Sequence, residues 1–211
     1  MNRGNAGGMV LPKPDNYDAF ERSLAEGLER QPCRLLAYQL KPNHGHLVLQ
    51  PTEEGGMSQF LRGASLAKVM RLHAHRGTGG QRHLYQGRFK CFPNPNNEHF
   101  RVACRFVEPN PSRAGLVQRA EEWRRGSLNR CRHKPERDLR LLSRGPMARP
   151  PRWAERVNKP LTAAERHTVR TSVNQSKPFG DQTWVHRIAQ KLRRHSSLRL
   201  RGRPKKSPDT F

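Results

Sequence analysis

Two short apolar segments flank a turn at Lys41-Pro42-Asn43-His44-Gly45-His46-Leu47-Val48-Leu49. The first segment covers residues 34–40 and the second covers residues 46–50. Between them, a proline and an asparagine supply residues that favour a tight turn. We therefore predict two antiparallel strands joined as a hairpin.

Helical periodicity appears on both sides of this hairpin. Apolar residues recur at helical spacing over residues 15–30 and again over residues 58–72. Asn97 can cap a third helix that ends before Pro109. A further strand is predicted over residues 84–92. The order helix, strand, strand, helix, strand, helix indicates an α+β domain.

The charge of the chain is large and uneven. Its 211 residues include 41 Lys and Arg and 17 Asp and Glu, for a net charge of +24. Residues 1–110 contribute +6, and residues 111–211 contribute +18. A field of this sign attracts polyphosphates through counterion release, so nucleic acid is the first expected partner and an anionic membrane surface the second. A compact, neutral, two-domain enzyme is excluded.

The apolar pattern thins after residue 130, where prolines interrupt an arginine-rich segment. We expect a domain over residues 1–130 and a basic, partly disordered DNA-binding extension over residues 131–211, with short helices over 154–169 and 184–195. No stretch approaches the roughly 18 apolar residues of a membrane span, and no amphipathic basic helix with a clean aromatic face favours a membrane surface, so no membrane partner is expected. The expected location is the cytoplasm, in association with the nucleoid.

His44 and His46 are the first candidate site residues. Side chains alternate along a strand, so these two lie on one face, roughly 6.6–7 Å apart, and both imidazoles can reach one divalent ion. A pair of this kind is more often simply two surface histidines at the start of a strand. The interpretation as a metal site needs independent support.

That support comes from a third helix and from a family resemblance. Phe106 and Asn110 are four residues apart, which is one helical turn. Together with residues 38–50, 83–90 and 110–117, they make the chain resemble the REP-associated tyrosine transposases, which belong to the single-tyrosine HUH transposases of insertion sequences. The resemblance covers about the first 128 residues.

The resemblance implies a ferredoxin-like (RRM-like) antiparallel sheet with helices on one face. Residues 1–5 look like the end of the family's first strand, most of which is then missing before Met1. Either the start codon is miscalled or the copy is truncated. The implied partner is single-stranded DNA that forms hairpins or palindromes, bound by a monomer or a homodimer.

The same resemblance implies a chemistry for the site. His44, His46 and Asn110 would hold Mg²⁺ or Mn²⁺, which polarises a scissile phosphate. In the family, a helix tyrosine attacks that phosphate and forms a phosphotyrosine, before the DNA is rejoined. Phe106 occupies the nucleophile position here and has no hydroxyl. An active transposase, a noncatalytic DNA-binding protein and a decayed transposase copy therefore remain alternatives.

Two more departures from the family pattern lie close to these residues. Gly45 replaces a bulky apolar residue that would pack into the core, so the histidine strand should be less well held. Pro109 disfavours helical geometry at Glu108, which predicts that Asn110 is displaced from the histidines.

Further DNA contacts are predicted outside this centre. Gln86, Arg88 and Lys90 would share one face of the strand over residues 84–92, as a phosphate-tracking stripe or as an ordinary solvated face. The C-terminal basic residues resemble an AT-hook, with a nonspecific basic tail as the alternative. The full set of predicted DNA-binding residues is Gln86, Arg88, Lys90, Arg113, Arg201, Arg203, Lys205 and Lys206.

Overall fold

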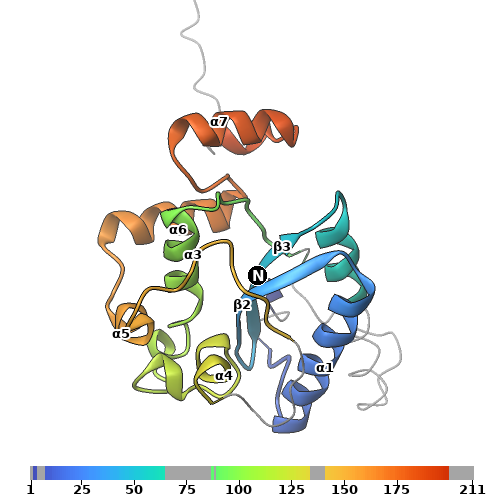
Figure 1. The fold of residues 1–211 in the computed structure, drawn as a ribbon, viewed down its shortest axis with the longest axis vertical. Helices are drawn as coiled ribbons and strands as arrows, with labels where there is room; N and C mark the ends of the chain where they lie inside the picture. The colour runs from blue at the N-terminus through green and yellow to red at the C-terminus, as the bar shows by residue number, and fades with distance from the viewer. Residues whose placement is uncertain (1, 4–7, 65–86, 88, 134–140, 200–211) are drawn as a thin grey trace, which may run out of the picture.

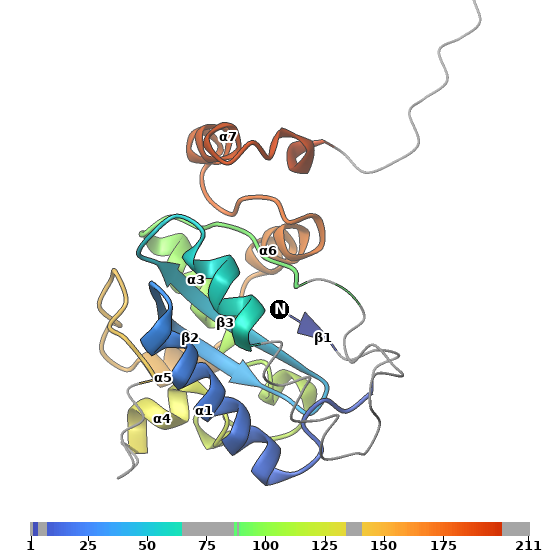
Figure 2. The same cartoon turned by 90° about the vertical axis from the view of Figure 1, so that its right-hand side faces the viewer.

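Three antiparallel strands form the sheet of the computed structural model, which describes residues 2–3, 8–64, 87, 89–133 and 141–199. They are β1 (Asn2–Arg3), β2 (Cys33–Leu40) and β3 (His44–Pro51), in the order β1-β3-β2. The predicted hairpin is confirmed as β2 and β3, and β1 is a strand within residues 1–5, as predicted (Figure 2). This order, with β1 and β2 both antiparallel to β3, is that of three strands of a ferredoxin-like sheet.

Helix α1 (Pro14–Arg30) covers one face of this sheet and confirms the helix predicted over residues 15–30. A proline in its first turn needs no helical hydrogen bond there, and Asp15 favours the positive end of the helix dipole. Tyr17 and Leu24 are buried and join a core cluster with Tyr38 and Leu40 of β2.

The opposite face of the sheet is covered by α3 (Glu98–Val107). Asn97 caps this helix as predicted, because its side chain accepts a hydrogen bond from the backbone N–H of His99 at 3.0 Å. Phe100, Cys104 and Val107 of α3 pack with Leu36 and Ala37 of β2 in a second core cluster.

Helices therefore cover both faces of the sheet, and the prediction of helices on one face is wrong (Figure 1). The physical reason lies in β2, in which seven of the eight residues are buried. Strand alternation turns Leu35, Tyr38 and Leu40 to the side of α1, and the register shift between Leu35 and Ala37 leaves Leu36 and Ala37 together on the side of α3. Both faces then need an apolar cover. The α+β class is confirmed.

After β3, the secondary structure agrees only in part with the elements predicted from the sequence. Residues 56–64 are helical, as predicted, whereas residues 65–72 lie outside the described part of the chain. The strand predicted over residues 84–92 is not present in its described part, because residues 89–92 form neither helix nor strand. Pro93 and Pro95 follow directly, and prolines cannot donate to a strand ladder.

The C-terminal half contains several short helices. They are η2 (Ser112–Ala114), η3 (Ala120–Glu122), α4 (Ser127–His133), α5 (Trp153–Asn158), α6 (Ala163–Gln175), α7 (Gln182–Lys191) and η4 (His195–Leu198). The single helix predicted over residues 154–169 is wrong, since it is divided into α5 and α6. Pro160 interrupts the helical pattern, and Thr162 caps the second helix. The helix predicted over residues 184–195 corresponds to α7.

The segment between α4 and α6 packs on the sheet domain. Leu141, Trp153 and Val157 are buried in the two core clusters, while α7 lies beyond α6 in both views (Figures 1 and 2). No helix in the described ranges is long and apolar enough to cross a membrane.

Candidate metal and nucleic-acid site

The two histidines lie at the start of β3, directly after the hairpin turn. The turn is closed by a hydrogen bond from the Lys41 N–H to the His44 carbonyl at 2.8 Å. His44 and His46 then project on the face that α3 covers, with ring centres 5.2 Å apart and the planes at 76°. The structure therefore brings the two imidazoles together, as the strand alternation predicts.

His46 is the more enclosed of the pair, with only 7% of its surface exposed. Its Nε2 lies 3.0 Å from Nδ2 of Asn110, so the amide donates to the ring nitrogen. Burial lowers the pKa of His46 well below its usual range, and the nearby charges of His44, Lys41 and Arg113 act in the same direction. A neutral imidazole is the form in which histidine binds a metal ion.

His44 is oriented by its neighbour in the turn. Nδ1 of His44 lies 2.7 Å from Oδ1 of Asn43. An amide oxygen only accepts hydrogen bonds, so Nδ1 has a proton, and in the neutral ring Nε2 would then have the lone pair. Histidine ligands of metals are commonly held in this way, by a hydrogen bond to the second ring nitrogen. Sequence reasoning missed this role of Asn43.

Asn110 lies beside His46, so the predicted displacement of this residue is wrong. Glu108 keeps helical dihedral angles, with φ −63° and ψ −38°, although Pro109 follows it. Its backbone N–H donates to the Cys104 carbonyl at 2.8 Å. Contacts of its side chain hold this geometry against the proline's preference.

Those contacts form a buried network around the Glu108 carboxylate. Oε1 accepts from Ser127 Oγ at 2.8 Å and from Arg149 Nη2 at 2.6 Å, and Oε2 accepts from Trp153 Nε1 at 2.7 Å. The Glu108 side chain is fully buried. The end of α3 is thus fixed by α4, α5 and the segment before α5, a role of Glu108 that the sequence did not indicate.

Phe106 completes the group of residues around His46. Its ring is 6.2 Å from that of His46 and nearly perpendicular to it. The Arg113 guanidinium lies 5.0 Å from the centre of the Phe106 ring and donates a hydrogen bond to the Phe106 carbonyl. The phenyl ring has no nucleophilic atom, so this position cannot form a phosphodiester adduct.

The residues at this site fit a divalent ion. Two imidazole nitrogens that each lie about 2.1 Å from one ion place their ring centres roughly 5 Å apart, which agrees with the observed separation. A half-turn of the Asn110 amide would present its oxygen beside His46 Nε2, since amide oxygen and nitrogen can exchange places. Among the described residues no three His, Cys, Asp or Glu side chains form a metal site, so the amide would be the third ligand.

Gly45 lies where the neighbouring strand leaves little space for a side chain. A Cβ atom at this position would lie 3.1 Å from Cδ2 of Leu40. The hairpin partner thus takes up part of the space that a bulky residue would fill. A cavity of about 150 Å³ is lined in part by Gly45, Leu47, Phe106 and Val173 of α6, so it borders residues from both faces of the sheet.

The other predicted DNA contacts are less closely connected to this centre. Lys90 is exposed and does not belong to a strand. Arg113 lies at the site through its contact with Phe106. The remaining predicted contacts, Gln86, Arg88, Arg201, Arg203, Lys205 and Lys206, lie outside the described residues.

Two arginines of α6 were missed by sequence reasoning. The charges of Arg166 and Arg170 act on Arg113. Their four-residue spacing predicts that they share a helix face, but it does not predict that this face lies near the histidine strand.

Comparisons with known proteins give one likeness in structure. A solved structure described as "Structure of the REP associates tyrosine transposase bound to a REP hairpin" is similar with a TM-score of 0.49 and 17% sequence identity, over 61% of this chain and 73% of that chain. No family model matches the sequence, and no curated protein matches it.

Proposed function

We propose that this chain binds single-stranded DNA, in hairpin form, at a transposase-like site, and that it does not cleave this DNA. The observation that supports the proposal best is the gathering of His44, His46, Asn110 and Phe106 from two distant segments, with Arg113 beside them. The net charge of +24 supplies the attraction for a polyanion.

In this proposal, the residues of the centre have separate roles. His44 and His46 hold a divalent ion with the Asn110 amide, and Asn43 keeps the His44 ring in the required orientation. Imidazole ligands favour Mn²⁺ over Mg²⁺, which prefers oxygen ligands. The ion, when bound, would polarise a phosphate oxygen. Arg113 would place positive charge next to the same phosphate.

Cleavage is excluded from the proposal because the attacking oxygen is missing. Tyr17 and Tyr38 are buried in the core cluster on the opposite face of the sheet, and so neither can approach a phosphate at the histidines. Tyr85 lies outside the described residues. The second candidate function is DNA strand cleavage and rejoining by an intact transposase, which the resemblance in sequence favours and Phe106 opposes.

The test restores the missing hydroxyl. The native chain and Phe106→Tyr are incubated with Mn²⁺ and a labelled library of single-stranded hairpins, and covalent adducts are separated on a denaturing gel. We expect both proteins to bind the DNA and only Phe106→Tyr to form an adduct. The double variant Phe106→Tyr with His46→Ala is the control, and it should bind DNA without forming the adduct.

Two results would contradict the proposal. An adduct formed by the native chain would mean that another residue attacks the phosphate. If the native chain failed to bind any hairpin at physiological salt, the proposed DNA-binding function itself would be wrong.

A further inference from the structure

Three arginines from two segments, η2 and α6, lie on the side of the molecule where α6 packs against α3. Arg113 belongs to η2 and stacks on the Phe106 ring, while Arg166 and Arg170 are one turn apart on α6. We call Arg113, Arg166 and Arg170 the arginine cluster. Helix α6 packs against α3, and an ion pair between Arg105 Nη1 and Glu165 Oε1 at 3.7 Å joins the two helices next to Arg166.

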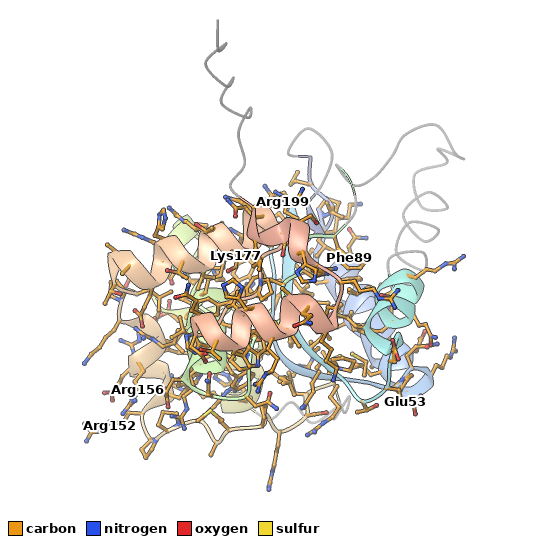
Figure 3. The ribbon with its side chains drawn as sticks, turned by 90° about the horizontal axis from the view of Figure 1, so that it is seen from above. Glu53, Phe89, Arg152, Arg156, Lys177 and Arg199 are labelled. Atoms are coloured by element: carbon orange, nitrogen blue, oxygen red, sulfur yellow. The ribbon has the colours of Figure 1, made fainter. Side chains whose placement is uncertain are left out.

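The cluster is adjacent to the histidine centre. Val173 follows Arg166 and Arg170 on the same side of α6, and it lines the cavity that His46 and Phe106 also line. Lys177 follows the end of α6 and Arg199 follows η4, and both residues are labelled among the C-terminal helices in the view from above (Figure 3). The C-terminal region therefore brings positive charge to the edge of the candidate site.

Within the described part of the chain, no acidic side chain pairs with these arginines. Among the residues that the structure describes, none of the three arginines forms an ion pair. Partial burial and the charges of Arg170 and Arg166 lower the pKa of Arg113 to about 10. Like charges held together without a counterion oppose folding, which is typical of a site that is neutralised by a ligand.

We infer that the arginine cluster binds a phosphate group of the DNA backbone next to the phosphate that faces His44 and His46. Guanidinium groups bind phosphate oxygens through paired hydrogen bonds, and three of them suit one dianionic or two monoanionic groups. This inference rests on the proposed function and deepens it, because it makes α6 a part of the DNA interface. Free phosphate has the same chemistry, so the experiment must separate these two sources.

The principal variant is Arg166→Gln with Arg170→Gln in the full chain. Both side chains are exposed, and glutamine keeps most of their length, so the variant should fold. The matched control is Arg22→Gln with Arg30→Gln, which removes the same charge from exposed positions of α1 on the other face of the sheet. Circular dichroism and thermal unfolding establish that each protein is folded.

Binding of a labelled single-stranded hairpin is measured over a series of salt concentrations. We expect the principal variant to lose about tenfold in affinity, in line with the loss of charge-assisted hydrogen bonds. The salt-dependence slope should fall by about 0.7 for each phosphate contact that is lost. The control should keep the native affinity within about twofold, since its arginines are remote from the site. Equal losses in the two variants would overturn the inference and leave general charge attraction as the explanation.

Thermal unfolding without DNA gives a second, independent measurement. At low salt the principal variant should unfold at a higher temperature than the native chain, because crowded like charges have been removed. This increase in unfolding temperature should be larger than the one that the control variant shows. Inorganic pyrophosphate should raise the unfolding temperature of the native chain and of the control, and it should have less effect on the principal variant.

The outcomes separate this inference from the proposed function. If the native chain and the principal variant bind the hairpin equally well, the arginine cluster has no role and the proposed function stands. If pyrophosphate stabilises only the native chain and the control while hairpin binding is unchanged, the cluster takes free phosphate and the inference about the DNA backbone is wrong. If no protein binds the hairpin, both proposals fail.

Discussion

Replacing the buried Glu108 by glutamine tests whether the end of α3 is fixed by its carboxylate. Both carboxylate oxygens accept hydrogen bonds, from Ser127, Arg149 and Trp153, and the side chain is fully buried. Glutamine presents an NH₂ group in place of one oxygen, so a donor faces a donor, and the Arg149 charge loses its partner. Breaking a buried, hydrogen-bonded ion pair costs about 3–5 kcal/mol. We expect Glu108→Gln to lower the free energy of unfolding by about this amount.

The matched control is Glu98→Gln on the same helix. Glu98 also pairs with an arginine, Arg101, but its side chain is 71% exposed. An exposed pair of this kind contributes about 0–1 kcal/mol. Urea unfolding followed by circular dichroism gives both values, with the slope against urea as a check that the two variants unfold as the native chain does. If Glu108→Gln cost no more than Glu98→Gln, the buried carboxylate would not hold the helix end, and another cause would be needed for the position of Asn110.

Two further perturbations test the stability of the fold. Asn97→Ala removes the side chain that accepts from the His99 N–H, and it should lower the free energy of unfolding by about 1 kcal/mol; no change in urea unfolding would contradict the capping role. The pKa of Asp18 is lowered, first by its hydrogen bond from Arg125, so its stabilisation is present above the unfolded-state pKa and is lost as the pH falls through the folded-state value. Asp18→Asn should therefore reduce the pH dependence of the unfolding temperature below about pH 4. If the unfolding temperature of the variant fell with pH as steeply as that of the native chain, the Asp18–Arg125 pair would not contribute to acid stability.

The hairpin and α3 could be predicted because their signals are local. Strand alternation places His44 and His46 on one face, and Asn97 supplies the cap at the start of a strongly periodic helix. Phe106 and Asn110 follow from the spacing of that helix. Each of these elements depends on residues that lie within a few positions of one another in the chain. Interactions over such short separations can be predicted from the sequence.

The wrong predictions involve contacts between distant segments. Pro109 correctly disfavours a helical Glu108 by itself, but hydrogen bonds from residues 19 to 45 positions later in the chain override this preference. Cover on both faces of the sheet depends on α1 and α3 packing on opposite sides of β2, which the local pattern of either helix does not indicate. The arginine cluster depends on where α6 packs, and the sequence of α6 does not indicate that α6 packs against α3.

The network around Glu108 also sets an order of events during synthesis. The helix that bears Phe106 leaves the ribosome well before Arg149 and Trp153, which together donate two of the three hydrogen bonds to the Glu108 side chain. Until these two residues emerge, the buried position of Glu108 is unfavourable, because an unpaired carboxylate prefers water. The histidine centre is therefore completed late in translation, after residues 149–153 have emerged from the ribosome. A nascent chain that ends before these residues would contain the residues of the site without their final arrangement.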